Sequence, residues 1–169
     1  MNKRAQSRSA ARLAAVQALY QHEMEGINSR LDGLQAALLT AKLPHIEVWT
    51  MGRKRVAALY DELLRGVGDV ERPRVREGAT HVYHLYVIKT GWRDALREHL
   101  SKRGVETAIH YPTALPLLPA YVSHGTGAEA IPNAARNQGR ILSLPIYPEM
   151  QAEAVEYVVG CIREFFGTN

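Results

Sequence analysis

Residues 104–121 read GVETAIHYPTALPLLPAY, and this stretch does most to decide the fold. Its first part, Val105–His110, is rich in β-branched and apolar residues and predicts a short strand. Three of the next nine residues are prolines, which cannot extend a strand or a helix, so a braced loop is expected after residue 110. His110 and Tyr111 should therefore lie where a strand ends at the edge of a sheet, a place where ligands commonly bind. The alternative interpretation is the ordinary packing of a loop.

Longer helical patterns lie on both sides of this stretch. Upstream, apolar residues recur at helical spacing from Ser29 to Leu64, and Ser29 with Asp32 fits a capping box at the start. Pro44 interrupts the pattern and should kink or split that helix. Downstream, residues 151–166 carry an apolar stripe at i, i+3, i+4 and i+7, so we expect a last helix with one buried face.

Further strands and helices are expected between these two patterns. The segments 81–89 (HVYHLYVIK) and 141–147 (ILSLPIY) are typical of strands, and residues 92–102 predict a helix that ends near Gly104. Asn133 is expected to cap a short helix before the second of these strands. Strands that are separated by helices, with long helices on both sides, predict a small α/β or α+β domain.

The composition is that of an ordinary soluble protein. Hydrophobic residues make up 46% and charged residues 22% of the chain, and no apolar run approaches the roughly 20 residues that span a bilayer. A cytoplasmic location without a membrane partner is therefore expected. The single cysteine, Cys161, excludes an internal disulfide and a cysteine-rich zinc site, and its place in an apolar helical stripe predicts buried packing.

The positive net charge of +4 is concentrated at the start of the chain. No acidic residue precedes Glu23, and the rest of the chain carries equal numbers of acidic and basic residues. Four basic side chains make up the excess: Lys3, Arg4, Arg8 and Arg12. A basic helical arm over residues 1–25 suits weak binding to RNA, although a solvated helix face or a frayed terminus explains the same charges.

Motifs of self-contained catalysis are not found in the sequence. It has no G-x-S-x-G, no Walker loop, no G-x-G-x-x-G and no H-E-x-x-H. His81 and His84 are three residues apart on an expected strand, which places them on opposite faces and argues against a shared metal ion. No metal site is expected, and no catalytic residue is assigned from the residues alone.

A polar triplet, Asn28-Ser29-Arg30, stands at the start of the first long helix. An amide, free backbone N–H groups and a guanidinium together suit a phosphate or a carboxylate. A capping box beside a solvated arginine accounts for the same residues, so the triplet alone leaves both interpretations open.

Three stretches, taken in order, resemble the C-terminal part of the DegT/DnrJ/StrS family of pyridoxal phosphate-dependent sugar aminotransferases. They are NSRLDGLQAALLTAKL (28–43), GVETAIHYPTALPLLPAY (104–121) and ILSLPIYPEM (141–150), and the resemblance runs from about residue 26 to 166. It implies the small C-terminal domain of a fold-type I aminotransferase over residues 26–169, with a long bent helix and a small sheet. It also implies transfer of an amino group from an amino acid, such as glutamate, to a keto sugar on a nucleotide carrier.

The resemblance assigns roles to four residues. Asn28 and Arg30 match the motif that reaches the phosphate of pyridoxal 5'-phosphate (PLP) across a dimer interface, and His110 and Tyr111 match the loop that approaches the nucleotide-sugar substrate. The implied partner is a second copy of the chain or a complementing cofactor-binding domain. Pro116 departs from the family pattern because many relatives have a second histidine there, so any role of that histidine is absent.

The same resemblance implies that the catalytic lysine is missing. In the family, the lysine that binds PLP covalently precedes the Asn-x-Arg motif by some tens of residues. Lys3 does not stand in the expected motif, and Lys42 follows Asn28 within the long helix. We therefore expect a fragment, from a truncated, fused or rearranged gene, that is inactive alone.

The first residues resemble a different family. RSAARLAAVQALYQHEMEG (8–26) is similar to the N-terminal helix of the NusB transcription antitermination family, an all-helical RNA-binding fold. This resemblance covers one helix and implies an alternative function, an RNA-binding module that acts through residues 1–25.

Overall fold

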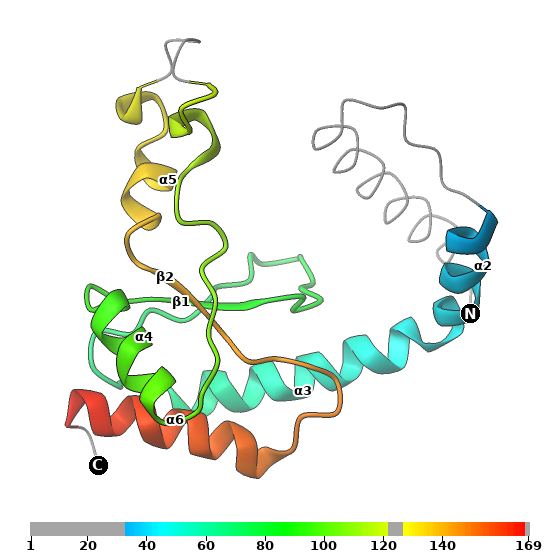
Figure 1. Cartoon of the computed structure of the whole chain (residues 1–169). Coiled ribbons are helices and arrows are strands. Elements are labelled where there is room, and N and C mark those ends of the chain that lie inside the picture. Colours follow the sequence, from blue (N-terminus) through cyan, green and yellow to red (C-terminus); the bar gives the residue numbers. More distant parts are fainter. Residues whose placement is uncertain (1–32, 122–126, 168–169) are drawn as a thin grey trace. The chain divides into compact units, whose positions relative to one another are not determined.

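The computed structural model describes residues 33–121 and 127–167 (Figure 1). The chain divides into two compact units, Met1–Val48 and Trp49–Asn169. Within the described residues, no helix has the length and the apolar character needed to cross a membrane.

The described part of the first unit is helical. Helix α2 covers Gly33–Lys42, the 3-10 turn η1 covers Leu43–His45, and helix α3 (Ile46–Leu63) begins directly afterwards. Pro44 lies in the 3-10 turn. Because proline has no N–H to donate, an unbroken α-helical ladder cannot pass through this position. The predicted interruption of the long helix is thus confirmed.

The second unit is built around a two-stranded antiparallel sheet. Strand β1 (Tyr86–Lys89) pairs with β2 (Ile141–Leu144), so that Tyr86 lies opposite Leu144 and Ile88 opposite Leu142. Single bridges extend the sheet on both sides. These bridges join Glu71 to Lys89 of β1, and Ala108 to Ser143 of β2.

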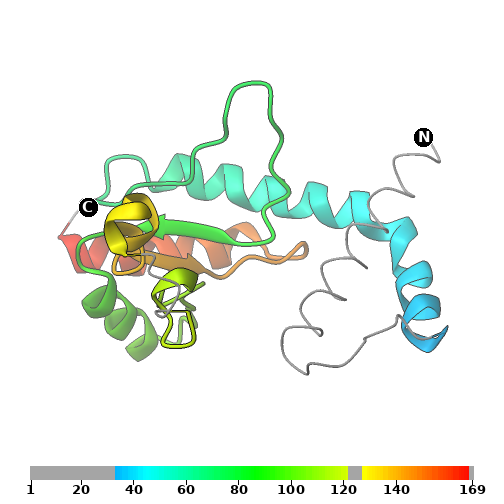
Figure 2. The same ribbon diagram turned by 90° about the horizontal axis from the view of Figure 1, so that it is seen from above.

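Three helices cover one face of the sheet with apolar side chains. Helices α3 and α6 (Ala152–Phe166) lie side by side beneath the strands, and α4 (Arg93–Lys102) packs against α6 (Figures 1 and 2). The core residues come from all of these elements and include Val56, Tyr60, Leu64, Tyr86, Ile88, Leu96, Leu100, Leu142, Leu144, Val155, Val159 and Ile162. Burial of each large apolar side chain contributes roughly 1.5–3 kcal/mol, so this layer holds the unit together.

The described part of the connection between Ala108 and β2, residues 109–121 and 127–140, contains short helices. They are η2 (Leu115–Leu117), η4 (Ala128–Ala130) and α5 (Pro132–Asn137). In Figure 1 this connection extends away from the sheet and returns to β2. The mixed α/β class, the helix after β1 and the last helix are confirmed. Cys161 is 5% exposed among the core residues, so its predicted buried packing is confirmed as well.

The predicted strand at residues 81–89 is too long, because β1 begins only at Tyr86. Tyr83 has a φ of 47°, in the left-handed region, and its N–H donates to Nδ1 of His81 over 2.9 Å. This local turn breaks the extended backbone, and His81 and His84 therefore do not lie on a strand. The predicted strand Val105–His110 is reduced to the single bridge at Ala108.

The predicted capping role of Asn133 is wrong. Helix α5 begins one residue earlier, at Pro132, and no side chain caps it. Proline suits the first helical position, because its missing N–H has no helical partner there and its φ is already helical. The Asn133 side chain instead accepts a hydrogen bond of 2.9 Å from Arg136.

Candidate functional site

The face of the sheet opposite the helices carries the candidate site, and we call it the polar face. Side chains alternate along a strand, so Val87 and Lys89 of β1 point away from the core, as do Ile141 and Ser143 of β2. Ser143 is nevertheless only 4% exposed. Its hydroxyl is therefore a buried polar group that needs a hydrogen-bond partner.

That partner is His110. Ala108 and Ser143 exchange two backbone hydrogen bonds, with N···O distances of 3.2 and 2.8 Å. Ile109 packs against the core, so the alternation brings His110 back to the polar face. Nδ1 of His110 lies 2.9 Å from Oγ of Ser143. The half-buried imidazole is thus held by one nitrogen at the edge of the sheet.

Tyr111 stands next to this imidazole with an open phenol. Its side chain is 68% exposed, and its ring meets the His110 ring edge-on, with centroids 5.7 Å apart and an interplanar angle of 85°. The structure therefore brings the two predicted substrate residues together. One is fixed by a buried hydroxyl, and the other is free to contact a ligand.

The loop after Tyr111 is held in place by Gln138, which lies near the other end of the connection to β2. The Ala114 N–H donates to Oε1 of Gln138 over 2.9 Å, and the Arg93 guanidinium donates to the Gln138 carbonyl oxygen over 3.3 Å. Pro116 lies in η2, which continues this braced segment. Gln138 thereby links the candidate loop to the start of α4.

An ion cluster occupies the Lys89 end of the polar face. The Glu71 carboxylate lies 2.8 Å from the Arg140 guanidinium and 3.8 Å from the Lys89 ammonium. The hydrogen bond from Arg140 is the main cause that lowers the pKa of Glu71, and the positive charges of Arg140 and Lys89 lower it further. Two cations around one carboxylate leave one positive charge in excess.

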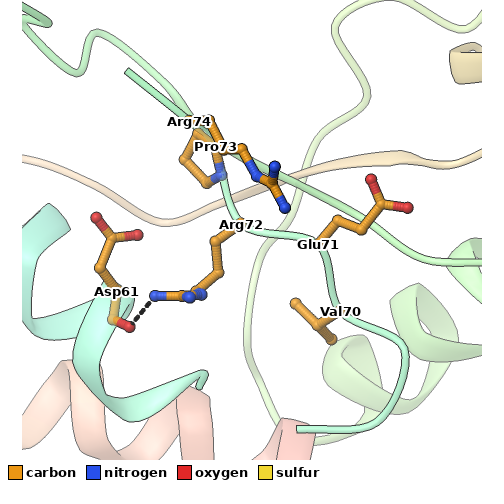
Figure 3. Close-up of a pocket in the computed structure, with 6 residues that line it drawn as sticks. All are labelled: Asp61, Val70, Glu71, Arg72, Pro73 and Arg74. Atoms are coloured by element: carbon orange, nitrogen blue, oxygen red, sulfur yellow. Dashed lines mark hydrogen bonds between the residues drawn. The ribbon is translucent and has the colours of Figure 1, made fainter. Parts of the chain in front are cut away.

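A hollow of about 240 Å³ adjoins this ion cluster at Glu71 (Figure 3). It is lined by Asp61, Val70, Glu71, Arg72, Pro73 and Arg74. Figure 3 shows the Arg72 guanidinium directed at the backbone oxygen of Asp61, to which it donates a hydrogen bond. The Asp61 carboxylate accepts from Tyr86 over 2.6 Å. The Arg72 guanidinium and the Asp61 carboxylate are therefore engaged in structural contacts, and neither His110 nor Tyr111 lines this hollow.

The two predicted cofactor residues, Asn28 and Arg30, lie outside the described residues. Their predicted contact with the cofactor phosphate stays a prediction. The described residues therefore test the geometry of His110 and Tyr111 only.

The described lysines do not fit a covalent PLP site. Such a lysine needs an enclosed, unprotonated amine. Lys42 and Lys54 are exposed, Lys89 pairs with Glu71, and Lys102 pairs with Glu98 over 2.7 Å. Within the described ranges no lysine is buried, so these residues do not by themselves form the covalent part of a cofactor site.

Comparison with known proteins identifies the family. The model of the DegT/DnrJ/EryC1/StrS aminotransferase family matches residues 4–163. The chain belongs to this family. The match covers most of residues 1–25 and gives no support for a separate antitermination helix there, so the NusB resemblance and RNA binding stay predictions.

Curated relatives include sugar transaminases. The chain is 42% identical over 149 residues to a pleiotropic regulatory protein of Geobacillus stearothermophilus. It is 37% identical over 146 residues to the dTDP-3-amino-3,4,6-trideoxy-alpha-D-glucose transaminase of Streptomyces venezuelae. These matches cover 87% and 86% of the chain, but only 40% and 38% of the relatives. The chain thus spans about two fifths of their length.

Solved structures give the same result for the fold. DesV from S. venezuelae superposes with a TM-score of 0.78 at 36% identity, over 89% of this chain and 40% of that chain. An aminotransferase of this family from Brucella abortus superposes with a TM-score of 0.76 at 34% identity, over 84% and 38%. DesV was solved in complex with a ketimine intermediate, and the aminotransferase family to which this chain belongs implies PLP as the cofactor.

Two residues that hold the candidate site together were not predicted from the sequence. Ser143 was attributed only to a buried strand, and Gln138 was not singled out. Ser143 stands between Leu142 and Leu144, so its side chain lies on the opposite face of the strand from the two leucines. This alternation is the sequence pattern from which Ser143 could have been found. For Gln138 we find no comparable signal, because its contact with Ala114 depends on the path of the long connection.

Proposed function

We propose that this chain carries the C-terminal small domain of a cytoplasmic, PLP-dependent aminotransferase that acts on nucleotide sugars. The reaction transfers an amino group from an amino acid, such as glutamate, to a keto sugar. The observation that carries the proposal is the His110–Tyr111 pair, held by Ser143 at the sheet edge in a chain of this family. Relatives named as transaminases of dTDP and UDP sugars support the substrate class.

His110 and Tyr111 position the sugar in this proposal. The second ring nitrogen of His110 and the exposed phenol of Tyr111 offer two polar groups side by side, which suit neighbouring hydroxyl or carbonyl oxygens of a sugar. Asn28 and Arg30 bind the cofactor phosphate, in agreement with the predicted anion site at a helix start. When bound, PLP supplies the electron sink that amino transfer requires.

We also propose that the polypeptide of 169 residues does not catalyse the reaction alone. The described lysines are exposed or ion-paired, and the remaining one, Lys3, does not stand in the family's lysine motif. The working partner is then a second copy of the chain or a separate domain that supplies the lysine. Light scattering of the purified chain tests the first possibility, and a monomer would argue against it.

A chimera tests the proposed function directly. In the S. venezuelae transaminase, the segment that matches this chain is replaced by residues 4–163. We expect a folded, PLP-loaded chimera that transfers amino groups to the sugar substrate of the parent enzyme. A folded and PLP-loaded chimera without transfer, beside an active parent, contradicts the proposal.

Variants of the chimera test the assigned residues. His110→Ala and Tyr111→Phe should lower kcat/KM for the sugar by at least about tenfold, because each removes a polar contact with the substrate. Tyr147→Phe is the matched control, since Tyr147 is also exposed, at 48%, and is not assigned to the site. Equal activities of all three variants would remove His110 and Tyr111 from the site.

A further inference from the structure

The backbone of Ser143 fixes its position in the sheet, independently of the contacts of its side chain. Its N–H and carbonyl oxygen both bond to Ala108, and its other side faces Val87 of β1. Its hydroxyl cannot turn to bulk water, because the residue is 4% exposed. The hydroxyl therefore occupies a set position in the sheet.

The hydrogen of this hydroxyl needs an acceptor. Within the described residues, the hydrogen-bonding partner of Ser143 Oγ is Nδ1 of His110, 2.9 Å away. A buried O–H without an acceptor is costly, whereas a hydroxyl oxygen without a donor is tolerated more easily. The lower-energy arrangement is thus one in which Ser143 donates and Nδ1 accepts.

This arrangement determines the tautomer of the imidazole. A neutral imidazole carries its hydrogen on one nitrogen only, so an accepting Nδ1 requires the hydrogen on Nε2. Within the described residues Nε2 of His110 makes no hydrogen bond. It therefore remains available to a ligand as a donor, and it favours an acceptor oxygen over an N–H group.

We propose that Ser143 is a positioning residue that holds His110 as the Nε2–H tautomer, so that His110 binds an acceptor oxygen of the ligand. The identity of that oxygen, a sugar carbonyl, hydroxyl or phosphate oxygen, rests on the proposed function. The tautomer itself rests on the contacts of Ser143 alone.

Nitrogen NMR of the full ¹⁵N-labelled chain tests this proposal without cofactor or substrate. Long-range ¹H–¹⁵N spectra at about pH 8, where most imidazoles are neutral, distinguish the two tautomers. His110→Gln assigns the signals of His110. His99 is the internal control, because its Nε2 faces the Cys161 carbonyl oxygen over 3.0 Å and its tautomer should not respond to changes at Ser143.

We expect the Nε2–H tautomer of His110 in the wild type and in Ser143→Thr, which keeps the hydroxyl. Ser143→Ala should give a mixture of both tautomers while the backbone spectrum stays folded. An Nδ1–H tautomer in the wild type would overturn the proposal, and this result does not depend on whether Ser143→Ala folds. An unchanged tautomer in folded Ser143→Ala would overturn it as well. Because no transamination is measured, these outcomes are separate from success or failure of the chimera.

Discussion

Tyr86 of β1 donates its phenolic hydrogen to Oδ1 of Asp61 on α3, with an O···O distance of 2.6 Å. The Tyr86 ring also stacks on Tyr60, with centroids 4.9 Å apart, and the Tyr60 hydroxyl donates to the Pro145 carbonyl oxygen over 3.0 Å. Both tyrosines are fully buried. They join α3 to β1 and to Pro145, which directly follows β2, in the sheet that positions His110.

These tyrosines predict a loss of stability at alkaline pH. Burial is the main cause that raises the pKa of Tyr86, and its hydrogen bond to Asp61 raises it further, while burial raises the pKa of Tyr60. Near pH 10 an unfolded tyrosine loses its proton while the folded one keeps it, so the native state binds more protons. The stabilisation is therefore complete below about pH 10 and declines above it, by about 1.4 kcal/mol per pH unit for each tyrosine.

Urea unfolding between pH 8 and 11 measures this effect. Tyr86→Phe removes one of the two groups, so its free energy of unfolding should fall less steeply with pH than that of the wild type. Identical slopes in the two proteins would show that Tyr86 titrates normally.

Two helical glycines should respond in opposite ways to alanine. A Cβ at Gly52 of α3 would lie 2.5 Å from the Pro148 carbonyl oxygen, which is backbone and cannot move aside easily. Gly52→Ala should therefore lower the free energy of unfolding. A Cβ at Gly160 of α6 meets nothing within 4 Å, so Gly160→Ala should raise it by about 0.5–1 kcal/mol. Stabilisation by Gly52→Ala would contradict the close approach of α3 to residue 148.

A second matched pair of variants compares a buried leucine of the core helix α4 with an exposed leucine. Leu100 is fully buried, and Leu100→Ala should cost about 2–5 kcal/mol because it removes buried apolar area and leaves a cavity. Leu115 is 58% exposed, so Leu115→Ala should change stability by less than about 0.5 kcal/mol. Denaturant midpoints of the two variants provide the comparison, and equal losses would place Leu100 outside the core.

The ion pair of Glu71 predicts a loss of stability at acidic pH. Because Arg140 lowers its pKa, Glu71 contributes stability above the pKa of the unfolded carboxyl, and this contribution is lost as the pH falls through the folded pKa. Arg140→Gln should therefore raise the pKa of Glu71 in ¹³C NMR titrations. Arg136→Gln is the control, because Arg136 bonds to Asn133 instead. A Glu71 titration that is the same in both variants would exclude Arg140 as the cause.

The sequence predicted the elements whose periodicity is regular over many residues. Arg93–Lys102 and Ala152–Phe166 are helices with a buried stripe, as expected. The segment 81–85 was misassigned because its aromatic and β-branched residues do favour strands, and the left-handed turn at Tyr83 leaves no compositional trace. Tertiary contacts override local preference at this position.

Only part of the candidate site could be predicted from the sequence. His110 and Tyr111 are adjacent in the sequence, so their contact required only the end of a strand and a proline loop. Ser143 lies 33 residues from His110, and its role depends on the pairing of Ala108 with β2, which no local pattern indicates. Asn28 and Arg30 remain predictions from the family resemblance.

The central proposal is that this polypeptide contributes the substrate-binding part of a sugar aminotransferase without its covalent cofactor lysine. Incubation with PLP, reduction by borohydride and peptide mapping by mass spectrometry test it most directly, with the S. venezuelae transaminase as the positive control. We predict only scattered, substoichiometric labelling of the surface lysines and no amino transfer. Stoichiometric labelling of a single lysine of this chain, together with turnover of a keto sugar, would contradict the account.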